Sequence, residues 1–189
     1  GITDLVINHA HLGAQIEQAL GDCSRFHAHI LYSPETHALE TAGGIANALP
    51  LLGDAPFAVI NSDIFCDYDF AHLPARAAAF QASGDAAHLV LVDNPPHHPN
   101  GDFGLADGRL TDPRSLIPDP RSSILTFSGI GLYQPGLFAH IARGTKAPLA
   151  PLLRAQIALG KVSGEHYQGL WVDVGTPQRL AELDMQLRT

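Results

Sequence analysis

The sequence predicts an α/β fold with a mixed, mainly parallel sheet and helices on both faces. Short apolar, β-branched runs alternate with helical segments through the first half of the chain, which is the pattern of successive βαβ units. The composition favours a folded domain, because 46% of the 189 residues are apolar and 16% are charged. Since no repeat, linker or low-complexity segment interrupts the chain, we expect one domain over residues 1–189.

The first half of the chain is expected to contain four strands separated by helices. The strands are the apolar runs at residues 4–8, 29–32, 57–61 and 88–92, and the helices lie at 12–20, 41–49 and 70–82. Gly21-Asp22 is typical of a helix C-terminus. Pro50 is expected to end the second helix, because the residue before a proline disfavours the α conformation.

The second half breaks this alternation. Three prolines and two adjacent histidines predict a loop over residues 94–101, and Asp107-Gly108 between two short apolar runs is a strong hairpin signal. A strand at 126–133, a helix at 149–159 and a strand at 170–174 follow. Thr176 as the N-cap and Pro177 at the first helical position begin the last helix.

The net charge and the composition of the chain exclude some classes of binding partner. The formal net charge of −8 is opposite in sign to that of a nucleic-acid-binding surface, and no apolar run reaches the roughly 20 residues that span a bilayer. Cys23 and Cys66 have neither zinc nor redox spacing and are too few for a disulfide framework. We therefore expect two ordinary buried thiols in a cytoplasmic protein.

Two aspartates are placed where a ligand site is expected. Asp63 comes just after an apolar strand, and ligands of open α/β sheets bind outside the carboxyl ends of the strands. Asp173 is flanked by apolar residues, where a carboxylate is costly to bury without a partner. If the two converge, they suit Mg²⁺ held together with substrate phosphates. The alternative for Asp63 is a helix or turn cap.

Glycines also open one predicted helix, in Glu40-Thr41-Ala42-Gly43-Gly44. Such glycines let a ligand approach backbone N–H groups at the positive end of the helix dipole, but similar clusters occur at ordinary turns. The segment is neither a G-x-G-x-x-G nor a P-loop motif, and no G-x-S-x-G elbow is present. The 11 histidines lack zincin spacing, and loop histidines are more often solvated than ligating.

Taken in order, several segments resemble the sugar-1-phosphate nucleotidyltransferases. They include Leu39-Glu40-Thr41-Ala42-Gly43-Gly44, Trp171-Val172-Asp173-Val174-Gly175-Thr176, and residues 6–10, 48–57, 125–129 and 160–167. Within that family the resemblance is greatest to the N-acetylmuramate α-1-phosphate uridylyltransferases of peptidoglycan recycling. It implies a Rossmann-like three-layer α/β/α fold and a reaction of UTP with a sugar 1-phosphate, assisted by Mg²⁺, that yields a UDP-sugar and pyrophosphate.

The resemblance also implies roles for individual residues. The metal ligands would be Asp63 and Asp173, although Ser62 stands where the family usually has a glycine. The nucleotide would be bound by Glu40, Thr41, Gly43, Gly44 and Asn61, and the sugar phosphate by Asp102, Gly104, Ser128 and Gly129.

One signature of the family has no match. Its glycine-rich loop with an Arg and a following Pro-Lys grips the triphosphate, and this chain begins where the family has already completed that loop. We therefore expect the N-terminal βα unit to be missing, no catalytic residue to be assignable, and the transferase activity of this chain alone to be impaired. Two alternatives remain: a mannose-1-phosphate guanylyltransferase, and a non-catalytic relative that binds a nucleotide or a partner protein.

Overall fold

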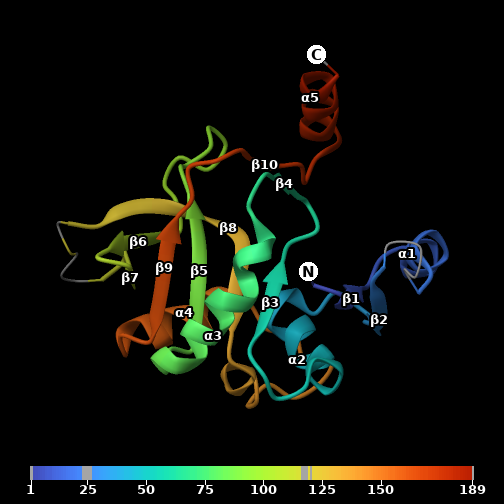
Figure 1. The fold of residues 1–189 in the computed structure, drawn as a ribbon, viewed down its shortest axis with the longest axis horizontal. Helices are drawn as coiled ribbons and strands as arrows, with labels where there is room; N and C mark the ends of the chain where they lie inside the picture. The colour runs from blue at the N-terminus through green and yellow to red at the C-terminus, as the bar shows by residue number, and fades with distance from the viewer. Residues whose placement is uncertain (1, 23–26, 116–118, 120, 189) are drawn as a thin grey trace. The chain divides into compact units, whose positions relative to one another are not determined.

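The computed structural model describes residues 2–22, 27–115, 119 and 121–188. They form two compact units, which are described separately (Figure 1). The first unit comprises residues 1–57 and 134–155, and the second comprises residues 58–133 and 156–189.

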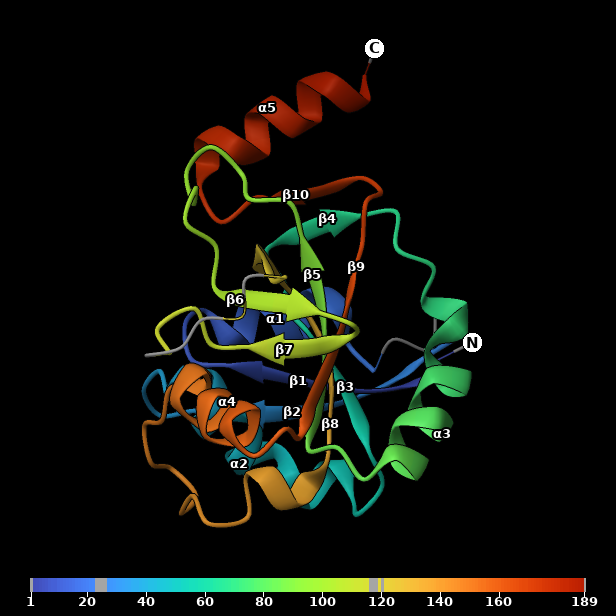
Figure 2. The same ribbon diagram turned by 90° about the vertical axis from the view of Figure 1, so that its left-hand side faces the viewer.

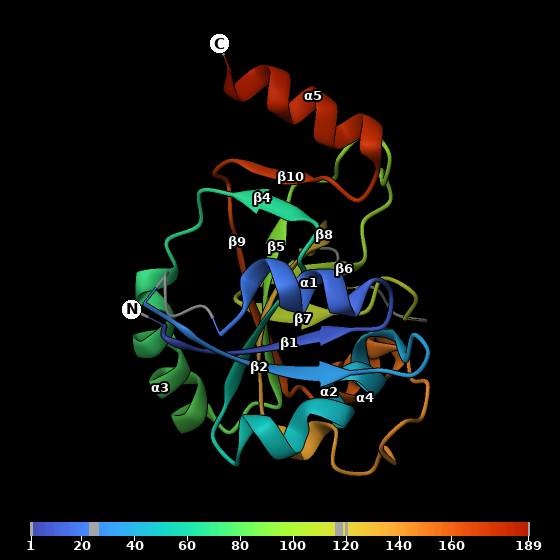
Figure 3. The same cartoon turned by 90° about the vertical axis from the view of Figure 1, so that its right-hand side faces the viewer.

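The first unit is built on a pair of parallel strands. β1 (Asp4–His9) and β2 (His29–Pro34) pair in register from Asp4–His29 to His9–Pro34. α1 (Gly13–Leu20) and α2 (Glu40–Leu52) lie on opposite sides of the pair (Figures 1 and 3). α2 supplies the buried apolar face, with Ala42, Ile45, Ala46 and Ala48. The predicted strands and helices of this unit are confirmed.

The second predicted helix is longer than expected. α2 runs through Pro50 to Leu52 and ends at Gly53, whose φ is 77° and whose N–H donates to the Leu49 carbonyl at 3.2 Å. Pro50 lies in the last turn, where the missing N–H removes a single helical hydrogen bond, and the buried residues before it hold the helix in place. The prediction that Pro50 ends this helix was wrong.

The second unit contains a six-stranded sheet in the order β3–β8–β5–β9–β7–β6. The strands are β3 (Phe57–Ile60), β5 (Ala87–Val92), β6 (Phe103–Ala106), β7 (Arg109–Thr111), β8 (Ser123–Tyr133) and β9 (Val162–His166). The prediction of a mixed sheet is confirmed. β5 pairs in parallel with β9 but antiparallel with β8, and β7 is antiparallel to both of its neighbours. The expectation of mainly parallel pairing therefore fails here, because a hairpin and the returning β8 reverse the chain.

The predicted hairpin is present between β6 and β7. Ala106 pairs with Arg109, and the two turn residues have positive φ, 50° at Asp107 and 74° at Gly108. A two-residue turn with both φ values positive matches the twist of the strands it joins.

A separate two-stranded ribbon ends in one predicted aspartate, Asp173, and begins directly after the other, Asp63. β4 (Ile64–Cys66) and β10 (Trp171–Asp173) pair antiparallel, with Asp173 opposite Ile64, and run side by side in Figures 2 and 3. α5 (Pro177–Leu187) follows β10 and begins as predicted: the Thr176 hydroxyl accepts a hydrogen bond from the Arg179 N–H at 3.3 Å.

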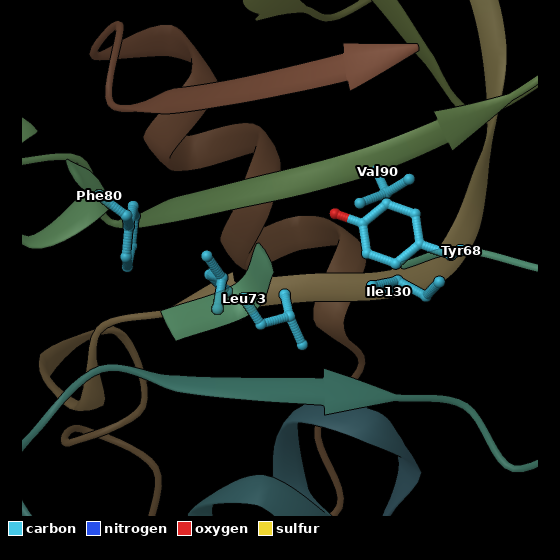
Figure 4. Close-up of a cluster of buried hydrophobic side chains, with 6 residues drawn as sticks. Tyr68, Leu73, Phe80, Val90 and Ile130 are labelled. Carbon is cyan, nitrogen blue, oxygen red and sulfur yellow. The ribbon is translucent and has the colours of Figure 1, made fainter. Parts of the chain in front are cut away.

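One apolar cluster lies between the sheet and α3 (Leu73–Ser83), which follows the short 3-10 turn η2 (Phe70–His72) (Figure 4). It consists of Tyr68, Leu73, Phe80, Val90, Ile130 and Leu132. Burial raises the pKa of Tyr68, whose hydroxyl donates to Glu165 at 2.8 Å. Cys66 is a half-buried free thiol packed against this cluster, and Cys23 lies outside the described residues.

The remaining elements are the 3-10 turn η3 (Pro135–Leu137) and α4 (Leu149–Ala158). Within the described residues, no helix combines the length and the apolar content that a bilayer crossing requires.

Candidate active site

A cavity of about 250 Å³ lies within the second unit. Its lining comes from the segments that follow β3 and β5, from the middle of β8 and from the β4–β10 ribbon, which is where ligands of α/β sheets bind. The lining residues are Asn61, Asp63, Ile64, Pro95, His97, His98, Thr126, Phe127, Ser128, Gly129, Trp171 and Asp173.

The two predicted carboxylates converge in this cavity. A Cβ placed on Gly175 would lie 3.0 Å from Asp63 Oδ2 and 3.0 Å from Asp173 Oδ1, so those oxygens are within twice that distance of each other. The β4–β10 pairing creates the convergence, and the Val174 N–H reinforces it by donating to the Asp63 carbonyl at 2.8 Å. Residues that are 110 positions apart in the sequence thus share one site.

Asp173 is held in its ionised form. Desolvation raises its pKa, but the Gly175 N–H at 2.8 Å and the charges of Arg179 and His97 outweigh desolvation, and the pKa falls below its usual value. Arg179 contacts Asp173 Oδ2 at 3.0 Å and His97 contacts the same oxygen at 3.2 Å. By contrast, within the part of the chain that the structure describes, the Asp63 carboxylate makes no hydrogen bond or ion pair.

This donor set fits a hard divalent cation. The described residues contain no group of three or more His, Cys, Asp or Glu side chains placed to hold a metal ion. Two carboxylates are nevertheless what Mg²⁺ usually takes from a protein when substrate phosphates supply further oxygens. The Asp63 carboxylate, which has no partner among the described residues, and the remaining lone pair of Asp173 are suited to that role.

Asn61, Ser128 and Gly129 all line this cavity. The Asn61 N–H donates to the Gly129 carbonyl at 2.9 Å, and Gly129 has a φ of 83°. A Cβ on Gly129 would lie 2.8 Å from Asn61 Cβ, so only glycine fits there. The Ser128 hydroxyl is buried and donates to the Val90 carbonyl at 2.7 Å, so it is already hydrogen-bonded within the protein.

The other two predicted sugar-binding residues are not among the cavity lining. Asp102 binds His98 Nε2 through Oδ1 at 3.1 Å and accepts the Phe127 N–H through Oδ2 at 2.9 Å. Gly104 is buried in β6, where a Cβ would fall on the Thr111 hydroxyl.

The predicted nucleotide-binding segment of α2 belongs to the first unit. Gly43 and Gly44 are buried, and side chains there would meet the Thr145 carbonyl and the Glu35 carboxylate, respectively. Both glycines therefore have a packing role within this unit. Glu40 and Thr41 begin the helix; Glu40 has an unusual φ of 60° and pairs with Lys146 at 3.1 Å.

Sequence reasoning missed His97 and His98, which line the cavity, and Arg179, which pairs with Asp173. The two histidines follow β5, and their position after the carboxyl end of a buried strand was the available signal. Arg179 lies six residues after Asp173 on the first turn of α5, and nothing in the local pattern distinguishes it from an ordinary surface arginine.

Comparisons with known proteins show which families and proteins this chain is similar to. The model of the family described as nucleotidyl transferase matches residues 1–189. An N-acetylmuramate alpha-1-phosphate uridylyltransferase from Neisseria meningitidis is 51% identical over 189 aligned residues, which cover 96% of this chain and 77% of the relative. Its counterpart from Caulobacter vibrioides is 35% identical, with 89% of this chain and 68% of the relative covered. A mannose-1-phosphate guanyltransferase from Hypocrea jecorina is 26% identical over 94% of this chain and 50% of its own length.

Solved structures share the fold. A Bacillus anthracis structure in complex with sucrose, assigned as a glucose-1-phosphate thymidylyltransferase, has a TM-score of 0.74 at 21% identity and covers 98% of this chain and 76% of its own. A UDP-glucose pyrophosphorylase complexed with UDP-glucose has a TM-score of 0.70 at 15% identity, with 98% and 81% covered. The architecture is thus that of the nucleotide-diphospho-sugar transferases, as predicted.

Proposed function

This chain belongs to the nucleotidyl transferase family, and we propose that it serves the transfer of a uridylyl group from UTP to N-acetylmuramate 1-phosphate. The observation that carries the proposal is the convergence of Asp63 and Asp173 in a cavity at the ends of the strands. The choice of base and sugar is supported by the two uridylyltransferase relatives, at 51% and 35% identity, against 26% for the guanyltransferase. The product would enter peptidoglycan recycling in the cytoplasm.

The proposed step is an in-line displacement. An oxygen of the sugar phosphate forms a bond to the α-phosphorus of UTP, and the bond from that phosphorus to the β-bridging oxygen breaks, so that pyrophosphate leaves with its electron pair. No protein group forms a covalent bond. The residues of the chain bind and orient the substrates, with Asn61 and Gly129 in the same cavity as the carboxylates.

Nucleotidyltransferases of this family typically use a divalent metal ion, and we propose that Asp63 and Asp173 hold Mg²⁺ here. When bound, such an ion supplies positive charge against the phosphate oxygens. Arg179 and His97 keep Asp173 oriented and ionised through contacts at 3.0 and 3.2 Å. The Gly175 N–H fixes the other oxygen of the same carboxylate.

The test compares carboxylate variants of the complete gene product. Asp63→Asn and Asp173→Asn each remove one negative charge, and we expect pyrophosphate release from UTP and N-acetylmuramate 1-phosphate to fall by about 10²-fold or more. Mn²⁺ binding, followed by electron paramagnetic resonance, should weaken in parallel. Asp107→Asn is the matched control, since Asp107 is exposed and Asn tolerates its positive φ. Unchanged rates and unchanged Mn²⁺ affinity in the first two variants would reject the metal assignment.

A further inference from the structure

Most polar side chains around the cavity already form hydrogen bonds to other groups of the protein. The Thr126 hydroxyl donates to Asn94 Oδ1 at 2.8 Å, and the Trp171 indole donates to the Ser128 carbonyl at 2.9 Å. The Ser128 hydroxyl donates to the Val90 carbonyl. These groups shape the cavity, and recognition of a charged ligand falls to Asn61, the two carboxylates and the two histidines.

The charge of the lining is unbalanced for an acidic sugar phosphate. Asp63 and Asp173 are anionic, and among the described lining residues His97 and His98 are the side chains that can carry a positive charge. The proposed sugar substrate has two anionic groups, its phosphate and the carboxylate of its lactyl ether. A cation held by the aspartates would serve the phosphates, so the carboxylate needs a second cationic partner.

A hydrogen bond to Asp102 orients His98, which can make such a contact. Its Nε2 lies 3.1 Å from Asp102 Oδ1, and the other oxygen of Asp102 accepts the Phe127 N–H at 2.9 Å. Because an ionised Asp102 accepts from Nε2, the free edge of the ring is Nδ1. The His98 side chain is 42% exposed and lines the cavity, so a ligand in the cavity can reach the ring. The Nε2 of His97 also contacts an aspartate, but that aspartate is Asp173, one of the two carboxylates assigned to the cation, so His97 belongs to that part of the site.

The loop around His98 is fixed by the protein rather than by a ligand. The His98 N–H donates to the Pro95 carbonyl at 2.9 Å, and the Asn94 amide donates to the carbonyls of Pro99 and Ile124 at 3.3 and 3.1 Å. Gly101 has a φ of 61° and closes against Leu125. A preorganised loop loses little entropy on binding, which favours selective recognition.

We infer that His98, positioned by Asp102, recognises the carboxylate of the sugar phosphate and makes the site selective for an acidic sugar over a neutral one. This inference rests on the proposed function. It assigns Asp102 a positioning role, in place of the direct sugar contact that the family resemblance implied.

The test is His98→Gln in the complete gene product. The Gln amide can still donate to Asp102 but cannot carry a positive charge. The substrates are N-acetylmuramate 1-phosphate and N-acetylglucosamine 1-phosphate, which lacks the lactyl carboxylate, each with UTP. We expect KM for the first to rise about tenfold to a hundredfold with little change in kcat, and kcat/KM for the second to change less than about twofold.

Binding is measured alongside turnover, as inhibition by free N-acetylmuramate and free N-acetylglucosamine. The variant should lose the preference for the acidic sugar. His72→Gln is the matched control, because His72 also pairs with an aspartate, Asp69 at 3.2 Å, but on the exposed surface of η2.

The outcomes separate the two proposals. If the unaltered protein shows no preference for the acidic sugar phosphate with UTP, the proposed function and this inference both fail. If the unaltered protein shows the preference and His98→Gln keeps it, or loses both substrates equally, the role of His98 is rejected while the proposed function stands.

Discussion

Gly175 lies next to both carboxylates, so a substitution there tests whether Asp63 and Asp173 act as one site. Its φ lies outside the left-handed region, so alanine fits the backbone, but a Cβ would stand 3.0 Å from both Asp63 and Asp173. We predict that Gly175→Ala lowers kcat/KM and Mn²⁺ affinity by about tenfold or more, because displaced ligands lose their geometry, while the melting temperature changes little.

The control for this substitution is Gly136→Ala, where a Cβ would meet nothing within 4 Å. If Gly175→Ala and Gly136→Ala behave alike in both measurements, the carboxylates do not act as one site.

Functional side chains could be predicted from the sequence where their polarity differs from that of their sequence neighbours. Asp173 stands among apolar side chains, and this conflict marked it from the sequence. The histidines at 97 and 98 lie in a proline-rich loop, where the sequence shows no conflict and solvation is the default interpretation. Only the folded cavity, with Asp102 behind one ring and Asp173 beside the other, distinguishes them from solvated histidines.

At the scale of elements, Asp85 and Arg109 join the start of β5 to β7. Asp85 is 6% exposed and binds Arg109 through both oxygens, at 2.7 and 2.9 Å; Arg109 also donates to the Gly160 carbonyl. The Arg109 hydrogen bonds lower the pKa of Asp85, against the opposing effect of desolvation. Because the folded state favours the ionised form, this contribution to stability is present above the ordinary pKa of the carboxyl and is lost as the pH falls through its lowered value.

We therefore predict that Asp85→Asn reduces the free energy of unfolding by about 1–3 kcal/mol at pH 7. The difference from the unaltered protein should shrink as the pH falls below the ordinary range of a carboxyl pKa, as measured by urea unfolding. Asp184→Asn, which breaks an exposed ion pair with Arg188 on α5, should cost less than about 1 kcal/mol. A loss at Asp85 that is the same at neutral and low pH would contradict the ion-pair account.

Elements with strong local signals were predictable, and those formed by long-range pairing were not. The turn at Asp107-Gly108 and the cap at Thr176 depend on residues within a few positions, and both are confirmed. β4 has three residues and owes its existence to β10, which lies more than 100 residues later in the chain. β9 carries Gly164 and Glu165 at its centre and is formed by its pairing with β5.

At the scale of the whole molecule, the net charge of −8 would repel the anionic substrates proposed here. Within the second unit, a divalent cation would separate Asp63 and Asp173 from the phosphates, and His98 would contact the substrate carboxylate. The family could be predicted from segments spread along the chain. The single domain over residues 1–189 stays a prediction, because the structure describes two units, each by itself.

The most direct test of the account is a substrate panel for the complete gene product with a divalent metal. UTP and GTP are each combined with N-acetylmuramate 1-phosphate and with mannose 1-phosphate, and kcat/KM is measured from pyrophosphate release with the nucleotide sugar identified by mass spectrometry. We expect kcat/KM for UTP with N-acetylmuramate 1-phosphate to exceed that of every other pair by about 10²-fold or more. A preference for GTP with mannose 1-phosphate, or the absence of any nucleotide sugar product, would contradict the proposed function.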